Sequence, residues 1–167
     1  MALLVQKYGG TSVADAERMR EVVDHVARTR RHGDDVVVVC SAMGKETDDL
    51  LRLAGEVSKV RPGREMDMLI TAGERKAMAL LCMALAGAGV PAESFTGSQA
   101  GFLTDTSHMN AKILEVRPDR VRAALAAGKV PVGRSDGLTG GGRCRRCAVA
   151  STTRRSPCAV ARRNEDL

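Results

Sequence analysis

This 167-residue chain has few aromatic side chains: tryptophan is absent, and there are one tyrosine and two phenylalanines. Valine, leucine, alanine and methionine must therefore build the core. No run of about 18 apolar residues occurs, and the N-terminus lacks the basic region and small-residue cleavage site of a secretory signal. These absences argue against a membrane-spanning or secreted protein and predict a soluble, cytoplasmic one about one domain long.

A disulfide framework and a zinc site are missing as well. The five cysteines are an odd number without regular spacing, which suits a reducing compartment. Cys144 and Cys147 form a C-x-x-C pair with Cys158 further on, but a fourth ligand at suitable spacing is absent and no histidine lies nearby. We therefore expect no metal site built from these residues.

The formal net charge of +6 does not identify a nucleic-acid-binding protein, because the excess is concentrated in one segment. Residues 1–132 carry 18 basic and 17 acidic residues, whereas residues 133–167 carry 8 arginines and 3 acidic residues. The basic segment has no aromatic residues interleaved for base stacking. We expect no nucleic-acid partner, and non-specific contacts of these arginines with RNA or DNA are the weaker interpretation.

Two glycine-rich nucleotide motifs, G-x-x-x-x-G-K-[ST] and G-x-G-x-x-G, are absent, but another glycine turn stands near the N-terminus. An apolar run over residues 3–5 leads into Lys7, Tyr8, Gly9 and Gly10, and a helical pattern follows. A strand, a glycine turn and a helix start in this order direct backbone N–H groups at one point, where a phosphate can bind. We interpret the glycines as allowing close approach of the backbone to the ligand and a positive φ. An ordinary strand-to-helix turn is the alternative.

A second strand and loop follow at a spacing typical of a βαβ unit. Apolar residues recur at helical spacing up to Gly33, and the β-branched run at residues 36–40 predicts a strand buried on both faces. This strand ends at Ser41, and another helix begins near Thr47. Because ligands bind outside the carboxyl ends of parallel strands, we expect Ser41 and Lys7 to face one crevice.

The rest of the body contains a long helix and several short strands. The long helical pattern starts at Glu65 and contains Gly73, which requires a close neighbour because glycine costs about 1 kcal/mol against alanine in a helix. Glu74 and Arg75 are by default a solvated charge pair. Short strands are predicted at residues 91–95, 112–116 and 130–132, and a helix at 121–125.

Taken together, several of these segments resemble the bacterial aspartokinases of the amino-acid kinase family. They appear in the family's order and spacing across residues 1 to about 132. The matching segments are residues 7–12, 38–44, 47–50, 65–69, 71–75, 94–101 and 110–113. The resemblance implies an α/β fold, namely a three-layer αβα sandwich with a mostly parallel sheet, truncated after about residue 132.

The same resemblance implies a phosphotransferase that uses Mg²⁺ and passes the γ-phosphate of ATP to the side-chain carboxylate of L-aspartate. That reaction is the first step toward lysine, threonine, methionine and diaminopimelate. By family analogy, the transferring phosphate is held by Lys7, which is the catalytic cation, and by Tyr8, Gly9 and Gly10. The aspartate is held by Ser41, Thr47 and Glu74.

The chain departs from the family pattern after Val132. The arginine–glycine–glycine–serine loop and the threonine–aspartate segment that cradle ATP in the family are not recognisable, and paired regulatory domains do not follow. Residues 133–167 are rich in Arg, Gly, Cys and Ser and lack apolar periodicity, so we expect a disordered or frameshifted end. The alternative function is a non-catalytic fragment that binds substrate weakly or pairs with a full-length subunit. As partners we consider a second copy of the chain, in a homo-oligomer, or full-length subunits.

Overall fold

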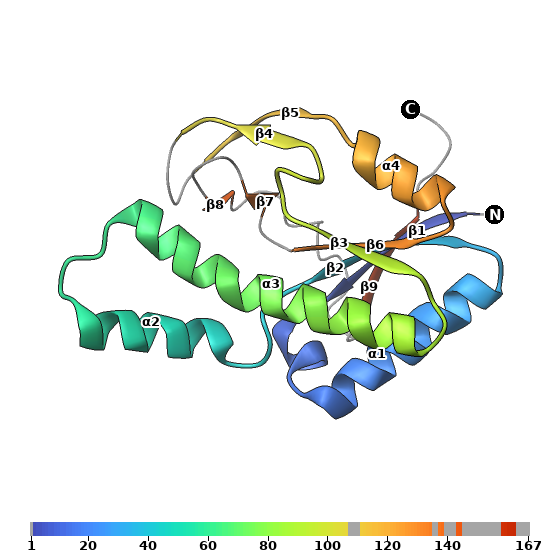
Figure 1. Cartoon of the computed structure of the whole chain (residues 1–167), viewed down its shortest axis with the longest axis horizontal. Helices are drawn as coiled ribbons and strands as arrows, with labels where there is room; N and C mark the ends of the chain where they lie inside the picture. Colours follow the sequence, from blue (N-terminus) through green and yellow to red (C-terminus); the bar gives the residue numbers. More distant parts are fainter. Residues whose placement is uncertain (1, 107–110, 135–136, 139–142, 145–157, 163–167) are drawn as a thin grey trace.

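A mostly parallel β-sheet is the centre of the structure, a computed structural model that describes residues 2–106, 111–134, 137–138, 143–144 and 158–162 (Figure 1). The strand order is β3-β6-β2-β1-β9. The four parallel strands are β3 (Ala92–Phe95), β6 (Val130–Arg134), β2 (Asp35–Cys40) and β1 (Leu3–Tyr8). Because these four strands run the same way, their carboxyl ends meet at one edge of the sheet.

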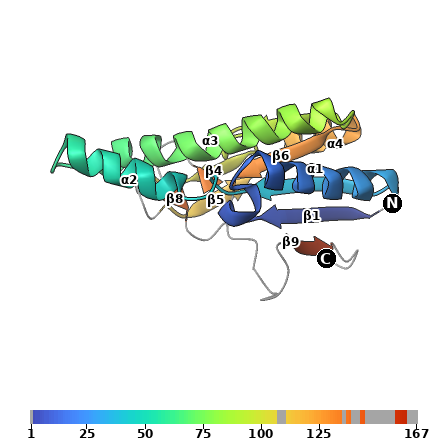
Figure 2. The same ribbon diagram turned by 90° about the horizontal axis from the view of Figure 1, so that it is seen from below.

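Helices α1 (Ala16–Arg31) and α3 (Gly63–Gly87) cover one face of this sheet, and Figure 2 shows both on the same side of β1. Alternate side chains of β1, β2 and β6 point into this layer. The core contains the aliphatic residues that the composition predicts. Its fully buried members include Val13, Val26, Val36, Val38, Leu81, Leu85, Val130 and Val132.

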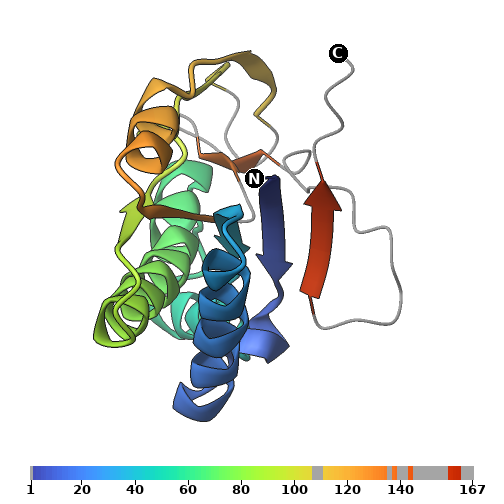
Figure 3. The ribbon, with the colours of Figure 1, turned by 90° about the vertical axis from the view of Figure 1, so that its right-hand side faces the viewer.

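The opposite face carries a second layer over β3 and β6. Helix α4 (Asp119–Ala126) and the antiparallel pair β4 (Phe102–Thr104) and β5 (Ile113–Val116) form it (Figure 3). A mostly apolar cavity of about 200 Å³ lies between this layer and the sheet and is lined by Phe95 and Phe102. Helical layers on both faces of a mostly parallel sheet confirm the predicted αβα arrangement.

Helix α2 (Glu46–Val57) packs on α3 rather than on the sheet, and the two extend together beyond it (Figure 1). None of the α2 residues is buried. Within the described residues, no helix combines the length and apolarity that a membrane crossing requires. The inner end of the α2–α3 pair reaches the carboxyl edge of β2, where Gly73 approaches Glu46 and Ala42.

The predicted elements are present, and three features differ from the expectation. The turn at Gly10–Val13 is a short 3₁₀ helix, and β4 was not predicted. Strand β6 continues to Arg134, two residues beyond its expected end, because β2 supplies backbone partners as far as the pair Cys40 and Arg134. Departure from the family pattern after Val132 therefore does not end the strand.

Beyond Arg134 the described residues form three short strands. β7 (Gly137–Leu138) pairs with β8 (Arg143–Cys144), and β9 (Cys158–Arg162) pairs antiparallel with β1. No sequence periodicity predicted these strands; backbone pairing alone defines them. The other positions of 135–167, Cys147 among them, lie outside the described residues, and the division at residue 132 into a family-like part and an aberrant end stays a prediction.

Candidate functional site

The loops that follow β1 and β2 lie side by side at the carboxyl edge of the sheet. The Ser41 backbone N–H donates to the Tyr8 carbonyl oxygen at 3.1 Å, and the Gly44 N–H donates to the Gly10 carbonyl oxygen at 3.0 Å. These bonds tie the two loops together just beyond the last paired residues of their strands. The expectation that the Lys7 turn and the Ser41 loop share one edge of the sheet is confirmed.

Gly10 is required for this loop contact, and the positive φ expected for the glycines of this turn is wrong. A Cβ on Gly10 would lie 2.8 Å from the Ala42 carbonyl oxygen, a distance that real Cβ contacts do not show. Gly9 has an ordinary φ of −75°, and Gly10 is not among the glycines with positive φ. A Cβ on Gly9 would meet nothing within 4 Å. Packing of loop on loop, rather than a left-handed backbone, therefore explains Gly10.

Lys7 and Tyr8 point to opposite faces of the sheet. Lys7 is half-buried and makes no ion pair with any residue in the described part of the chain. The Tyr8 side chain is buried among the core residues under α1. Lys7 thus offers an unneutralised cation beside the glycine turn, whereas only the backbone of Tyr8 can line the site.

A network of hydrogen bonds connects the Tyr8 hydroxyl to Gln6 of β1 and His25 of α1. The Tyr8 hydroxyl donates to Gln6 Oε1 at 2.9 Å and lies 2.7 Å from His25 Nδ1, which must carry the proton of that bond. Gln6 Nε2 donates to Thr29 Oγ1 at 2.9 Å. Burial, together with the charge of Arg28, lowers the pKa of His25 and favours its neutral form. This network anchors the end of β1 to α1.

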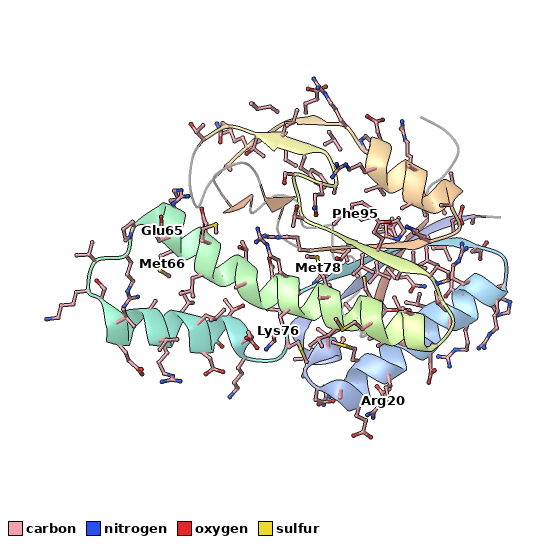
Figure 4. The ribbon with its side chains drawn as sticks, in the orientation of Figure 1. Arg20, Glu65, Met66, Lys76, Met78 and Phe95 are labelled. Atoms are coloured by element: carbon pink, nitrogen blue, oxygen red, sulfur yellow. The ribbon has the colours of Figure 1, made fainter. Side chains whose placement is uncertain are left out.

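Thr47 lies in the first turn of α2, half-buried, one residue after Glu46. The Glu46 carboxylate pairs with Lys76 of α3, and Figure 4 shows Lys76 where α2 approaches α3. A Cβ on Gly73 would lie 2.9 Å from Glu46 Cγ. The close neighbour predicted for Gly73 is therefore α2, and this contact holds the Thr47 turn against α3.

Glu74 is buried and faces the sheet, so its interpretation as a solvated partner of the exposed Arg75 is wrong. Its carboxylate Oε2 lies 2.8 Å from Nε of Arg134, the last residue of β6. The exposed fractions of the two side chains are 5% for Glu74 and 1% for Arg134. The structure therefore places Glu74 at the same carboxyl edge as Ser41, in an ion pair with a residue that the sequence did not single out.

The pairing of β2 with β6 places Arg134, and with it Glu74, near the end of β2. Burial raises the pKa of the Cys40 thiol to about 12, and the nearby Cys82 and Glu74 contribute in the same direction. Cys40 is the residue before Ser41 and the register partner of Arg134. Ser41, Glu74 and Arg134 thus gather around one point of the sheet edge.

Two further polar residues of α3, Asp67 and Thr71, are buried on the same side of the helix as Glu74. The Thr71 hydroxyl donates to the Met68 carbonyl oxygen at 3.0 Å. Positions 67, 71 and 74 follow helical spacing, so a polar stripe inside an otherwise apolar helix face was readable from the sequence. Asp67 is not among the residues predicted for the site.

The lysine and the turn fit an anion such as a phosphate. Lys7 supplies a full charge, and the open space at Gly9 leaves the backbone of the turn accessible. Among the described residues, no group of three or more His, Cys, Asp and Glu side chains could hold a metal ion by itself. Mg²⁺ is commonly bound by one or two carboxylates together with substrate phosphates, so such a group is not needed for it.

Loops gathered at the carboxyl edge of a mostly parallel sheet are typical of α/β proteins that bind their ligands at that edge. The model of the Amino acid kinase family matches residues 2–152. The chain belongs to this family.

Curated relatives are aspartokinases. The chain is 58% identical over 130 residues to the aspartokinase of Corynebacterium glutamicum and 59% identical to that of Mycolicibacterium smegmatis, and each match covers 78% of this chain and 31% of the relative. The chain thus spans about a third of the length of these relatives.

Solved structures agree on the fold. An aspartate kinase from Synechocystis matches with a TM-score of 0.70 and 43% identity, over 84% of this chain and 23% of that one. Aspartokinase III of Escherichia coli matches with a TM-score of 0.67 over 86% of this chain and 42% of that one. At 19% identity the second match supports the fold alone.

Proposed function

We propose that this chain carries the substrate-binding part of an aspartate kinase, which transfers the γ-phosphate of ATP to the side-chain carboxylate of L-aspartate. The observation that carries the proposal is the contact between the Lys7 turn and the Ser41 loop, with Glu74 close to the same strand end. The similarity to aspartokinases supports it. The solved E. coli aspartokinase III, which shares the fold, is a complex with aspartate and ADP.

Lys7 and the backbone of Gly9 and Gly10 would hold the transferring phosphate. Phosphoryl transfer requires positioning and charge neutralisation, because the transition state spreads negative charge over the phosphate oxygens. Lys7 meets this need, since it has no ion pair among the described residues to give up. Mg²⁺ would supply further neutralisation of the phosphates when bound.

Ser41, Thr47 and Glu74 would hold L-aspartate. The hydroxyls of Ser41 and Thr47 can donate to its carboxylates, and the Glu74 carboxylate suits its α-ammonium. The attacking side-chain carboxylate is already ionised at neutral pH, so no general base is required. The residues needed are therefore those that bring two anions together.

A hydroxamate assay with Mg²⁺, ATP and L-aspartate tests the proposal on the purified chain. We expect Lys7→Ala to abolish whatever turnover the wild-type chain has. Lys59→Ala, which removes an exposed lysine between α2 and α3, is the matched control and should leave the rate unchanged. Equal rates for wild type and Lys7→Ala would contradict the role of Lys7.

The second candidate is a non-catalytic fragment that binds substrate weakly, self-associates or pairs with a full-length subunit. The ion pair between Glu74 and Arg134 favours it, because it occupies the carboxylate assigned to the substrate's α-ammonium. Calorimetry with ATP separates the two: a folded chain that does not bind ATP supports the fragment. Gel filtration of the chain, alone and mixed with a full-length aspartokinase, tests the two kinds of assembly.

A further inference from the structure

The ion pair between Glu74 and Arg134 occupies the group that the proposed function assigns to the substrate's α-ammonium. Nε of Arg134 lies 2.8 Å from Oε2 of Glu74, and both side chains are almost fully buried. Arginine keeps its charge under all ordinary conditions, so it neutralises the carboxylate permanently. A substrate ammonium would therefore meet a carboxylate whose charge Arg134 already balances.

Strand pairing holds Arg134 in place. It is the terminal residue of β6, in register with Cys40 of β2. The competing cation therefore stands on the sheet and not on a surface loop. Its chain neighbours Val132 and Gly133 are also paired, with β2 on one side and β3 on the other.

The basic residues next to Glu74 in the sequence do not compete with Arg134 for this role. Arg75 and Lys76 are both exposed on the outer side of α3. The ammonium of Lys76 is paired with Glu46 of α2. Arg134, by contrast, lies directly against the Glu74 carboxylate.

We propose that Arg134 determines the ligand preference of this site: by occupying Glu74 it removes the selection for a ligand with an α-ammonium, so the chain treats L-aspartate and a dicarboxylate without an ammonium group alike. The inference rests on the proposed function, because it assumes that Glu74 lies in the aspartate site. Arg134 acts through Glu74 and is a positioning residue that sets specificity. Replacing it should release the carboxylate for the ammonium.

Calorimetric titration with L-aspartate and with succinate, which lacks the ammonium, tests this on the whole chain. For wild type we expect equal affinities for the two ligands. For Arg134→Ala we expect L-aspartate to bind at least about tenfold more tightly than succinate, since a charge-assisted hydrogen bond to Glu74 becomes available. Succinate affinity should stay unchanged.

Arg117→Ala is the matched control, because it removes an arginine from an exposed pair with Glu115. It should leave both affinities as in wild type. If circular dichroism shows that Arg134→Ala is unfolded, the titrations are made with Arg134→Met instead, which keeps most of the side-chain volume. The wild-type comparison of the two ligands needs no variant at all.

The possible results distinguish a failure of the role of Arg134 from a failure of the proposed function. A tenfold preference for L-aspartate already present in wild type, or equal affinities in every folded Arg134 variant, would overturn the role of Arg134 and leave the aspartate site standing. Failure of wild type and all variants to bind either ligand would instead overturn the proposed site and, with it, the inference. A preference that appears only when Arg134 is replaced supports both.

Discussion

The two halves of the candidate site differ in how their charges are satisfied. On the phosphate side, Lys7 is half-buried and has no ion pair within the described residues. On the ammonium side, Glu74 is buried against Arg134 at 2.8 Å. One half is therefore ready for an anion, whereas the other already holds an internal cation. A group that awaits a ligand should contribute little to stability, and a group that is already paired should contribute much.

The largest expected effect on stability comes from removing the ion pair between Glu74 and Arg134. Glu74→Gln leaves the Arg134 charge buried without its carboxylate, so we expect a loss of about 3–5 kcal/mol in the free energy of unfolding. Lys7→Ala, the counterpart in the other half, should cost less than about 0.5 kcal/mol. Urea denaturation of the three chains measures both differences.

The double variant Glu74→Gln/Arg134→Met is the control for that comparison. It removes both charges, so most of the stability lost in Glu74→Gln should return. A double variant as unstable as Glu74→Gln would mean that the two side chains are not coupled. Similar losses of unfolding free energy for Lys7→Ala and Glu74→Gln would contradict the difference proposed between the two halves of the site.

The next effect concerns the loop contact that shapes the phosphate half. Gly10→Ala puts a Cβ 2.8 Å from the Ala42 carbonyl oxygen, so we expect it to cost about 1–3 kcal/mol. Gly9→Ala meets nothing within 4 Å and should stay within about 0.5 kcal/mol of wild type. Thermal unfolding followed by circular dichroism separates the two. Equal losses of stability in the two variants would mean that Gly10 and Ala42 are not in close contact.

A smaller effect is expected from the network beneath the turn. Tyr8→Phe keeps the ring but leaves Gln6 Oε1 and the His25 ring without the hydroxyl, at a cost of about 1–2 kcal/mol. Because this network ends at the strand that carries Lys7, Tyr8→Phe should also weaken phosphate-side binding while leaving the Glu74–Arg134 pair intact. Denaturation and ADP titration check the two parts. Unchanged stability would show that the hydroxyl bonds contribute nothing.

The smallest expected effect is a pH dependence from His25. Its pKa in the folded chain is lowered from 6.5, so below that pH the unfolded chain binds a proton that the folded chain binds less well. The stabilising contribution is therefore present above about pH 6.5 and is lost as the pH falls toward the folded-state pKa. His25→Gln should flatten this part of the stability curve. An identical slope of the free energy of unfolding against pH in wild type and variant would show that His25 does not cause this pH dependence.

Much of the fold follows from the sequence for identifiable reasons. The continuous apolar run of β2 and the amphipathic spacing of α1 define a βαβ unit, and parallel pairing then forces the Lys7 and Ser41 ends to one edge. Gly73 within α3 predicted a close neighbour, which proves to be α2. These features depend on local sequence patterns, which can be recognised in a single sequence.

Other features depend on contacts between residues that are far apart in the sequence, which no local pattern predicts. The Gly10 requirement arises from a carbonyl of another loop, and the burial of Glu74 arises from an arginine 60 positions later in the chain. Arg134 falls where the family pattern ends, so neither periodicity nor resemblance predicted its place. The strand β9 likewise becomes visible only through its pairing with β1.

The most direct test of one shared site is a ¹H–¹⁵N NMR titration of the wild-type chain with Mg²⁺–ADP, followed by L-aspartate. We expect ADP to shift the amides of residues 7–12 and L-aspartate to shift those near Ser41 and Thr47, which adjoin them across the loop contact. Shifts confined to α4 and β3, or two ligands acting on separate ends of the sheet, would contradict the account.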